Sequence, residues 1–168
     1  MSKPECLSPF SPPGTADEDH AGVHVPPPVL HIAAVFSGVG LATVFPLRLP
    51  APTWLAVAGL LLMTGALLIA GWAFREFGDK SNPVPPNQPI GALMTGGPFR
   101  FTRNPLYLAL ALLHAGIGLL SGNAWVLIAL IPTLLIVRFY VIAREEAYLI
   151  RRFGKAYRDY MASVRRWF

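Results

Sequence analysis

Residues 104–137 read NPLYLALALLHAGIGLLSGNAWVLIALIPTLLIV, a run of 34 positions without Asp, Glu, Lys or Arg. As one helix this run would extend about 51 Å at 1.5 Å per residue, well beyond a bilayer core of about 30 Å. The chain must therefore fold back, and Ser121-Gly122-Asn123 is the strongest turn signal within the run. We expect a helical hairpin with spans over 105–120 and 124–143. The first of these spans is short, so it is either tilted or crosses the bilayer only in part.

Working outward from the hairpin, a second uncharged run covers the 26 residues 49–74 and predicts a span over 53–74. Apolar residues 29–47 predict the first span, and the prolines around Arg48 mark the turn between the two. The whole chain is 54% hydrophobic and only 14% charged, which is outside the usual balance of soluble domains. We therefore expect an all-α integral membrane bundle of about four transmembrane helices.

The two ends of the chain lack the composition of a membrane span. Residues 1–28 are rich in proline, so we expect a flexible tail ahead of one membrane domain, residues 29–168. No basic segment leads directly into an apolar core, so the first span is not expected to be a cleaved signal peptide. Residues 144–164 repeat apolar side chains at helical spacing among basic ones, which predicts an amphipathic helix on the membrane interface.

The net charge of +5 comes from basic residues that flank the apolar runs. With four spans, Arg48 lies alone on one side, and the other thirteen Lys and Arg lie at or near the opposite side. The positive-inside rule then places both termini in the cytoplasm, and we expect a protein of the cell's inner membrane. An alternative topology with three spans would divide the basic residues between both membrane faces, which argues against it. The chain has no recognised module for nucleic acid, and its single cysteine, Cys6, belongs to no metal-ligand cluster.

A basic segment leads into the third predicted span, where Arg100 and Arg103 stand just ahead of Asn104 and Pro105. Proline suits the first turn of a helix because it lacks an N–H group, which makes Asn104 the expected N-cap. The free backbone donors and the positive end of the helix dipole would then form an anion-binding corner with the two arginines. The alternative is that both arginines only follow the positive-inside rule.

Two adjacent carboxylates, Glu145 and Glu146, follow the fourth predicted span. At a basic boundary that faces lipid headgroups, they are unfavourable unless a cation pairs with them. Arg138 precedes Glu145 by seven residues, so in an α-helix the two share a face and could bracket one ligand. The alternative is a structural ion pair, or an arginine that only extends to the interface.

The third predicted span carries Tyr107 and His114, which are seven residues apart and thus on one helix face. An ionisable residue inside a membrane helix is a functional candidate. The alternative for His114 is a hydrogen bond to a neighbouring helix.

Three motifs, in order and at suitable spacing, resemble the superfamily of isoprenylcysteine carboxyl methyltransferases and phospholipid methyltransferases. They are Arg103-Asn104-Pro105-Leu106-Tyr107, Glu145-Glu146-x-x-Leu149 and Phe153-Gly154-x-x-Tyr157-x-x-Tyr160. The resemblance extends from about residue 78 to the C-terminus. It implies a bundle of membrane helices that encloses S-adenosylmethionine (SAM) near the cytoplasmic face, with the first two motifs in the cofactor pocket.

The sequence departs from the carboxyl methyltransferases at two positions. Asn104 stands where they typically have histidine, and Ala109 stands where they typically have glycine. Asparagine keeps hydrogen-bonding groups but cannot titrate near neutral pH. The departures argue against the prenylcysteine branch more than against SAM binding.

SAM presents a carboxylate, an ammonium group, ribose hydroxyls and an adenine ring, and each suits a different side chain here. We expect Arg100 or Arg103 to bind the carboxylate. Glu145 or Glu146 would bind the ammonium or the ribose. Tyr107 or Tyr148 would pack on the adenine. Further residues expected in the cofactor pocket are Asn104, Pro105, Leu108 and Leu149.

The candidate catalytic residues are Arg138, Glu145 and His114. A carboxylate or thiolate acceptor needs no base, whereas an amine acceptor must be neutral, and His114 or a glutamate could then remove its proton. Candidate acceptors, which would enter from the bilayer, are a prenylcysteine-like carboxylate, an amino-headgroup lipid and a hydrophobic small molecule. One alternative function is an NADPH-dependent enone or sterol reductase. The other is a non-catalytic membrane partner or ligand carrier, and no strong motif indicates the oligomeric state.

Overall fold

The computed structural model describes residues 21–50, 52–80 and 90–167. Within these ranges the chain is helical apart from turns and an isolated β-bridge between Arg48 and Asn123, which confirms the all-α expectation. The helical elements, in chain order, are α1 (Pro27–Val44), α2 (Thr53–Asp79), the 3-10 turn η2 (Gly97–Arg100), α3 (Pro105–Leu120), α4 (Ala124–Ile136), the π-helical segment η3 (Val137–Ile142), α5 (Ala143–Phe153) and α6 (Lys155–Ser163).

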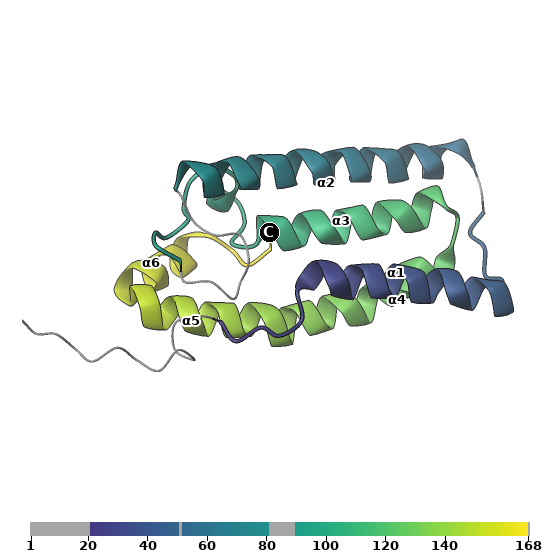
Figure 1. Cartoon of the computed structure of the whole chain (residues 1–168). Helices are drawn as coiled ribbons and strands as arrows, with labels where there is room; N and C mark the ends of the chain where they lie inside the picture. Colours follow the sequence, from purple (N-terminus) through teal and green to yellow (C-terminus); the bar gives the residue numbers. More distant parts are fainter. Residues whose placement is uncertain (1–20, 51, 81–89, 168) are drawn as a thin grey trace, which may run out of the picture.

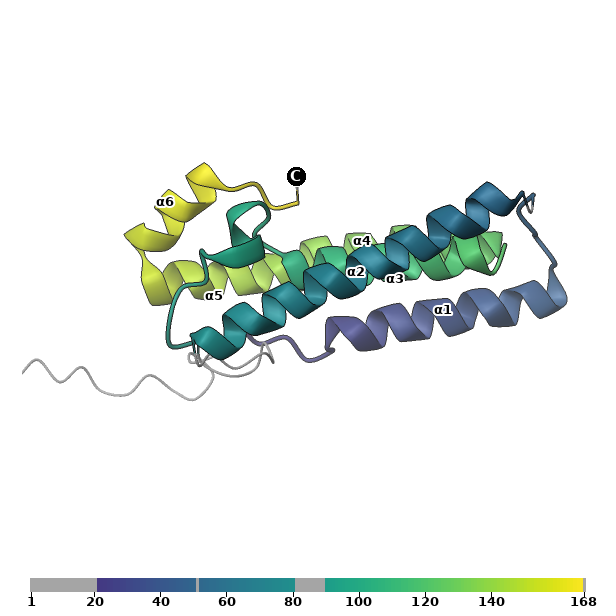
Figure 2. The same cartoon turned by 90° about the horizontal axis from the view of Figure 1, so that it is seen from above.

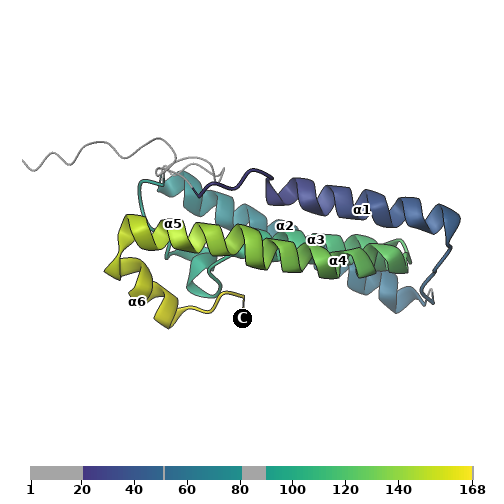
Figure 3. The same cartoon turned by 90° about the horizontal axis from the view of Figure 1, so that it is seen from below.

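In the described part of the chain, α1, α2, α3 and the rod that begins with α4 lie side by side and alternate in direction (Figures 1 and 2). The fourth rod consists of α4, η3 and α5 in one continuous helix, which is seen best from below (Figure 3). α2 packs along α3 and α1 packs along α4, while α3 contacts α1, α2 and α4. This topology brings the start of α3 and the end of α5 to the same end of the bundle, which also carries α6 and is called here the α6 end.

The bundle has the dimensions and surface of a membrane protein. Among the described residues, three helices are long and apolar enough to cross a bilayer, namely Pro27–Val44, Thr53–Asp79 and the continuous rod Ala124–Phe153. The remaining helix of the expected hairpin, α3, has 16 residues and the predicted bounds. Large apolar side chains cover the outer surface, as at Phe36 and Leu68, which are 72% and 70% exposed. Such continuous apolar exposure suits lipid rather than water.

Two glycines bring α2 and α3 close together away from the α6 end. A Cβ on Gly116 would lie 2.7 Å from the carbonyl oxygen of Gly59, and a Cβ on Gly59 would lie 2.8 Å from the carbonyl oxygen of Gly116. Small residues at such a crossing allow the backbones of membrane helices to approach and gain van der Waals contact.

The C-terminal region forms two helices, α5 and α6, where one interfacial helix over 144–164 was expected. The fourth rod continues through Phe153, and the chain then turns at Gly154, whose φ of +54° favours glycine. Glu146 and Tyr148 on α5 are buried, so α5 belongs to the bundle and the shorter α6 follows the turn. The amphipathic pattern arises because one face of this region packs on protein.

The N-terminal region also differs from expectation. The predicted tail covered residues 1–28, of which residues 1–20 lie outside the described part. Ala21 and Val23 are buried in a cluster with Val141 and Tyr148. The carbonyl oxygen of Gly22 accepts a hydrogen bond from Arg144 at 2.8 Å. Residues 21–23 are therefore packed on the bundle, ahead of exposed residues 24–26 and α1.

The close contact of α2 with α3 predicts the effect of a single methyl group. We expect Gly116→Ala to destabilise the protein by about 1–3 kcal/mol, because the added Cβ meets backbone that cannot move aside. Thermal unfolding in detergent measures the change. Gly71→Ala is the matched control, because nothing lies within 4 Å of a Cβ there. Equal stability of the Gly116 variant and wild type would contradict the packing argument.

Candidate functional site

A cavity of about 590 Å³ lies at the α6 end of the bundle, within the size range of small-molecule sites. Its walls come from residues 21–28, α2, the loop before α3, α3, α5 and α6. The polar residues that line it are His24, Arg103, Asn104, Tyr107, Glu145, Glu146, Tyr148, Tyr157 and Tyr160. The cavity thus has one polar region, formed where the start of α3 meets α5.

The same cavity continues into an apolar lobe between the first turn of α1 and the helices α2 and α3. This lobe is lined by Pro26, Pro27, Pro28, Ala66, Leu67, Ala70, Phe74, Leu110 and Leu113. Leu67 and Phe74 line the lobe and are nevertheless 65% and 50% exposed. These two residues therefore belong both to the wall of the cavity and to the outer surface of the bundle.

Glu146 is the centre of the polar region. Its side chain is 9% exposed, and one carboxylate oxygen lies 3.3 Å from Nη2 of Arg103. Arg166 donates to the same oxygen through Nε at 3.0 Å and to the other oxygen through Nη2. The ion pair between Arg103 and Glu146 confirms that the entrance of α3 and the acidic end of the fourth rod converge. The hydrogen bond to Glu146 also raises the pKa of Arg166, so that guanidinium stays charged.

Arg103 has donors that the described residues leave unused. Its side chain is 9% exposed, and its Nε and Nη1 atoms are buried without a hydrogen-bond partner in the described part of the chain. Buried unpaired donors are rare, because each one carries a desolvation penalty. A guanidinium that lines a cavity with two unused nitrogens is suited to bind an anion there.

Glu145 and the tyrosines complete the polar region. The hydroxyl of Tyr107 donates a hydrogen bond to Oε1 of Glu145. The hydroxyl of Tyr148 accepts a hydrogen bond from the backbone N–H of Ile90 at 3.2 Å, and its ring lines the cavity. Pro105 and Leu149 also line the cavity. The predicted residues Arg103, Asn104, Pro105, Tyr107, Glu145, Glu146, Tyr148 and Leu149 are thus brought together.

Asn104 occupies the expected N-cap position of α3 but does not cap it with its side chain. Its Nδ2 instead donates to the carbonyl oxygen of Arg166 at 3.0 Å. Its backbone N–H donates to Oγ1 of Thr102 at 3.3 Å. The C-terminal segment therefore takes the side chain that would otherwise cap the helix.

Arg100 and Leu108 lie outside the cavity lining, contrary to expectation. Arg100 is exposed at the end of η2, because that short turn directs it away from the start of α3. Leu108 is buried on a face of α3 that does not line the cavity. Of the two arginines in this motif, Arg103 alone reaches the polar region described here.

Arg138 also lies apart from Glu145. It is exposed, and its guanidinium lies 5.6 Å from the centre of the neighbouring Phe139 ring. The expectation of a shared face assumed an uninterrupted α-helix, whereas residues 137–142 form a π-helical turn. A π turn accommodates an additional residue, so it rotates Arg138 away from the face that carries Glu145.

His114 is buried but does not line the cavity. Its Nε2 lies 3.0 Å from the carbonyl oxygen of Val126, and its Nδ1 lies 3.1 Å from Nδ1 of His31. Because a carbonyl can only accept, Nε2 of His114 donates to α4 and its Nδ1 accepts from α1. This geometry fits the alternative expectation, a histidine that links neighbouring helices.

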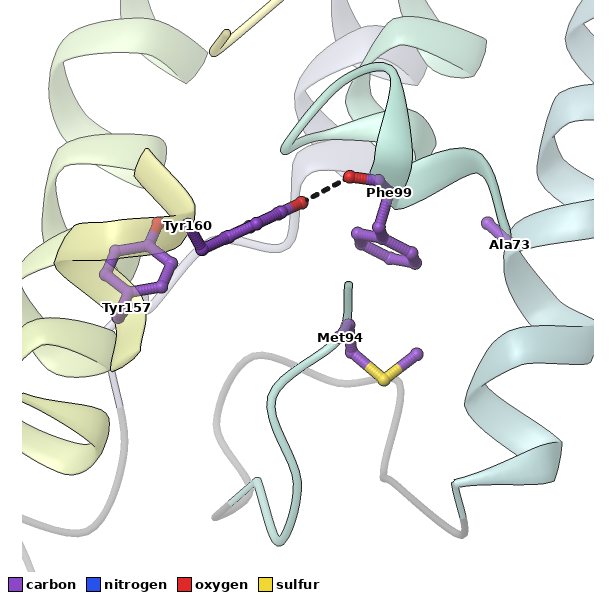
Figure 4. Packing of buried hydrophobic residues seen from close by; sticks show 5 residues of the cluster. All are labelled: Ala73, Met94, Phe99, Tyr157 and Tyr160. Carbon is purple, nitrogen blue, oxygen red and sulfur yellow. Dashed lines mark hydrogen bonds between the residues drawn. The ribbon is translucent and has the colours of Figure 1, made fainter. Parts of the chain in front are cut away.

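The C-terminal residues of the site were not assigned from sequence, although two of them stand in a quoted motif. Tyr160 donates through its hydroxyl to the carbonyl oxygen of Phe99 at 2.6 Å, above a cluster that contains Met94 and Ala73 (Figure 4). Burial, reinforced by the nearby carboxylate of Glu146, raises the pKa of Tyr157 to about 12, so its phenol is neutral at physiological pH. In the sequence, the tyrosines that recur after Gly154 could have indicated Tyr157 and Tyr160 as site residues. No sequence pattern indicated Arg166.

Comparisons with known proteins agree with this geometry. A family model described as phospholipid methyltransferase matches residues 54–156. An uncharacterized protein of Haemophilus influenzae is 40% identical over 62 residues, which cover 37% of this chain and 98% of that protein. No solved structure matches significantly. The matched residues include Arg103, Glu145 and Glu146, whereas Tyr157, Tyr160 and Arg166 follow them.

The buried position of Glu146 predicts a large effect on stability. We expect Glu146→Ala to cost about 3–5 kcal/mol, because it leaves two partly buried arginines without their counter-charge. The exposed pair Lys155 and Asp159 is the control, since an ion pair in water contributes little and Asp159→Ala should be nearly neutral. Thermal unfolding in detergent compares the two variants. Similar small effects at both positions would show that Glu146 does not hold the site together.

Proposed function

Because the chain belongs to the phospholipid methyltransferase family, we propose that it transfers a methyl group from SAM to a lipophilic acceptor at the α6 end of the bundle. The family supports methyltransferase activity in a membrane protein. The observation that carries the proposal is the group of Arg103, Glu145 and Tyr107 at the polar end of an otherwise apolar cavity. Cation, carboxylate and aromatic ring are the three kinds of group that SAM requires.

The residues present fit SAM, and Arg103 is the strongest point of the fit. Its two unused nitrogens would bind the carboxylate of SAM as charge-assisted donors. Glu145 would bind the ammonium group or a ribose hydroxyl. We prefer Glu145 to Glu146 for this role, because Glu146 already pairs with two arginines through both oxygens. The ring of Tyr148 would pack on the adenine.

When bound, SAM supplies an electrophilic methyl group, and the acceptor forms its new bond as the carbon–sulfur bond breaks and S-adenosylhomocysteine leaves. The protein contributes mainly by holding the reacting groups in position, because an in-line displacement gains most from orientation. Apolar walls keep water from the reacting groups. For an amine acceptor, Glu145 would accept the proton, since His114 does not line the cavity, and Glu145 would then bind SAM through a ribose hydroxyl rather than through the ammonium group.

The apolar lobe supports a lipophilic acceptor that enters from the side. Its walls carry the side chains of alanine, leucine, proline and phenylalanine, which favour a hydrocarbon chain. Leu67 and Phe74 line this lobe and are also exposed on the surface that suits lipid, which favours entry at this side. We propose that a prenylcysteine-like carboxylate, an amino-headgroup lipid or a hydrophobic small molecule binds here, with its acceptor atom toward the polar region.

The distribution of basic residues supports an orientation in the membrane. Arg48 lies in the connection between α1 and α2, at the end opposite α6. The described basic residues from Arg75 to Arg166 lie mostly toward the α6 end. By the positive-inside rule we propose that the α6 end faces the cytoplasm, where SAM is available, and that the membrane is the cell's inner membrane.

The first test of this proposal is SAM binding. We expect isothermal titration of the detergent-purified protein to detect SAM and not NADPH. Arg103→Ala and Glu145→Gln should each weaken SAM binding by about 100-fold or more, because each removes a charged partner from a buried site. Arg100→Ala is the matched control and should bind normally, since Arg100 is exposed and outside the cavity.

Binding of NADPH in place of SAM would support a reductase instead. If wild type bound neither, the proposed function would fail and a non-catalytic partner would be the better interpretation. Unchanged affinity in the Arg103 and Glu145 variants would refute these residues as cofactor ligands.

The apolar lobe predicts a separate effect on the acceptor. We expect Ala70→Phe to reduce methyl transfer to a host lipid extract by about 10-fold or more, because the ring fills the lobe, while SAM affinity stays unchanged. Transfer is measured with methyl-labelled SAM, and the labelled product identifies the acceptor. Ala33→Phe on the exposed face of α1 is the control. Equal transfer by the Ala70 variant would place the acceptor elsewhere.

A further inference from the structure

The last residues of the chain pass over the start of α3. The carbonyl oxygen of Arg165 accepts from the backbone N–H of Arg103 at 3.1 Å. The carbonyl oxygen of Arg166 accepts from Oγ1 of Thr102 at 3.1 Å and from Nδ2 of Asn104 at 3.0 Å. Residues 165–166, called here the C-terminal strap, are thus fixed by the backbone N–H of Arg103 and by the side chains of its two neighbours, Thr102 and Asn104.

The strap brings one guanidinium to Glu146 in a two-pronged arrangement. Nε and Nη2 of Arg166 donate to different carboxylate oxygens of Glu146. This is the fork geometry in which arginine binds a carboxylate most strongly. Arg103 shares only one of these oxygens, through a single nitrogen at 3.3 Å. Arg166 therefore holds the position on Glu146 that Arg103 would otherwise take.

Because Arg166 forms the two-pronged pair with Glu146, two nitrogens of Arg103 are left without a hydrogen-bond partner among the described residues. A buried carboxylate with one arginine as neighbour would be expected to form the fork with it, since that pairing satisfies most donors and acceptors. Here the fork belongs to Arg166, and Nε and Nη1 of Arg103 remain unpaired among the described residues. Arg166 itself does not line the cavity, whereas Arg103 and Glu146 do.

We propose that Arg166 is a positioning residue for the cofactor: by occupying both oxygens of Glu146, it keeps Arg103 from a two-pronged pair and leaves its donors for the carboxylate of SAM. The inference rests on the proposed function. It assigns a role to a residue beyond the matched range 54–156 and outside the cavity wall. Without Arg166, the guanidinium of Arg103 would turn to Glu146 and lose its availability to an anion.

The test compares two ligands that differ in the group Arg103 would bind. S-adenosylhomocysteine carries the amino acid carboxylate, whereas methylthioadenosine keeps the nucleoside and sulfur but lacks it. We expect Arg166→Ala to weaken S-adenosylhomocysteine binding by about 10- to 100-fold in isothermal titration, the effect of charge-assisted hydrogen bonds. Methylthioadenosine binding should be unchanged.

Arg165→Ala is the matched control. It removes the same charge from the same strap, but the side chain of Arg165 is exposed and only its backbone contacts the site. Both ligands should bind this variant normally. Arg166→Lys keeps the charge and cannot form the fork, so it should show a smaller loss that is again confined to S-adenosylhomocysteine. In methyl transfer, the Arg166 variants should raise KM for SAM and leave kcat nearly unchanged.

The possible results distinguish the proposed SAM-binding function from the positioning role of Arg166. If wild type did not bind S-adenosylhomocysteine, the proposed function would be wrong. If wild type bound it and Arg166→Ala bound it equally well, only the positioning role would be overturned. Equal losses for both ligands would show that Arg166 merely holds the fold together. Should Arg166→Ala not fold in detergent, Arg166→Lys gives the same comparison.

Discussion

A carboxylate buried at the end of a membrane bundle is stable only if cations pair with it, and Glu146 meets this condition with Arg103 and Arg166. The two arginines come from distant parts of the chain, one from the entrance of α3 and one from the C-terminal strap. Their shared partner on α5 therefore fixes three segments relative to one another. The remaining contacts of the polar region, including that of Asn104 with the strap, depend on this arrangement.

The bundle combines close packing at one end with open space at the other. Gly59 and Gly116 allow α2 and α3 to approach away from the α6 end. Toward the α6 end, Ala66 and Ala70 on α2 line the cavity opposite the leucines of α3. The rigid contact sets the helix spacing, and small side chains then leave room for a ligand. The candidate site thus consists of a cavity between the helices and of charged side chains at the helix ends, and it needs no separate domain.

Much of this arrangement was predictable because bilayer thickness restricts what an uncharged sequence can do. The run 104–137 is too long for one crossing, so the turn at 121–123 and the antiparallel hairpin followed from length alone. The hairpin in turn places Arg103 and Glu146 at the same end of the bundle, whereas their direct ion pair is seen only in the structure. The contact of Arg166 with Glu146 was not predictable, because it depends on backbone carbonyls of the basic C-terminal segment that bind residues before α3, and no sequence pattern marks such carbonyls. The packing of residues 21–23 was hidden because they lie within a segment, residues 1–28, that is rich in proline.

The π-helical segment η3 has a consequence for how such a site arises and is lost. An α-helix advances about 100° per residue, so the additional residue of a π turn rotates all that follows by about that angle. The orientation of α4 about its axis is set by its contacts with α1 and α3. Residues 137–142 then determine how α5, which carries both glutamates, is rotated relative to α4. A one-residue deletion there would restore regular winding and turn the acidic pair away from Arg103 and Arg166. The length of this helix is therefore constrained as strictly as the identity of its charged residues.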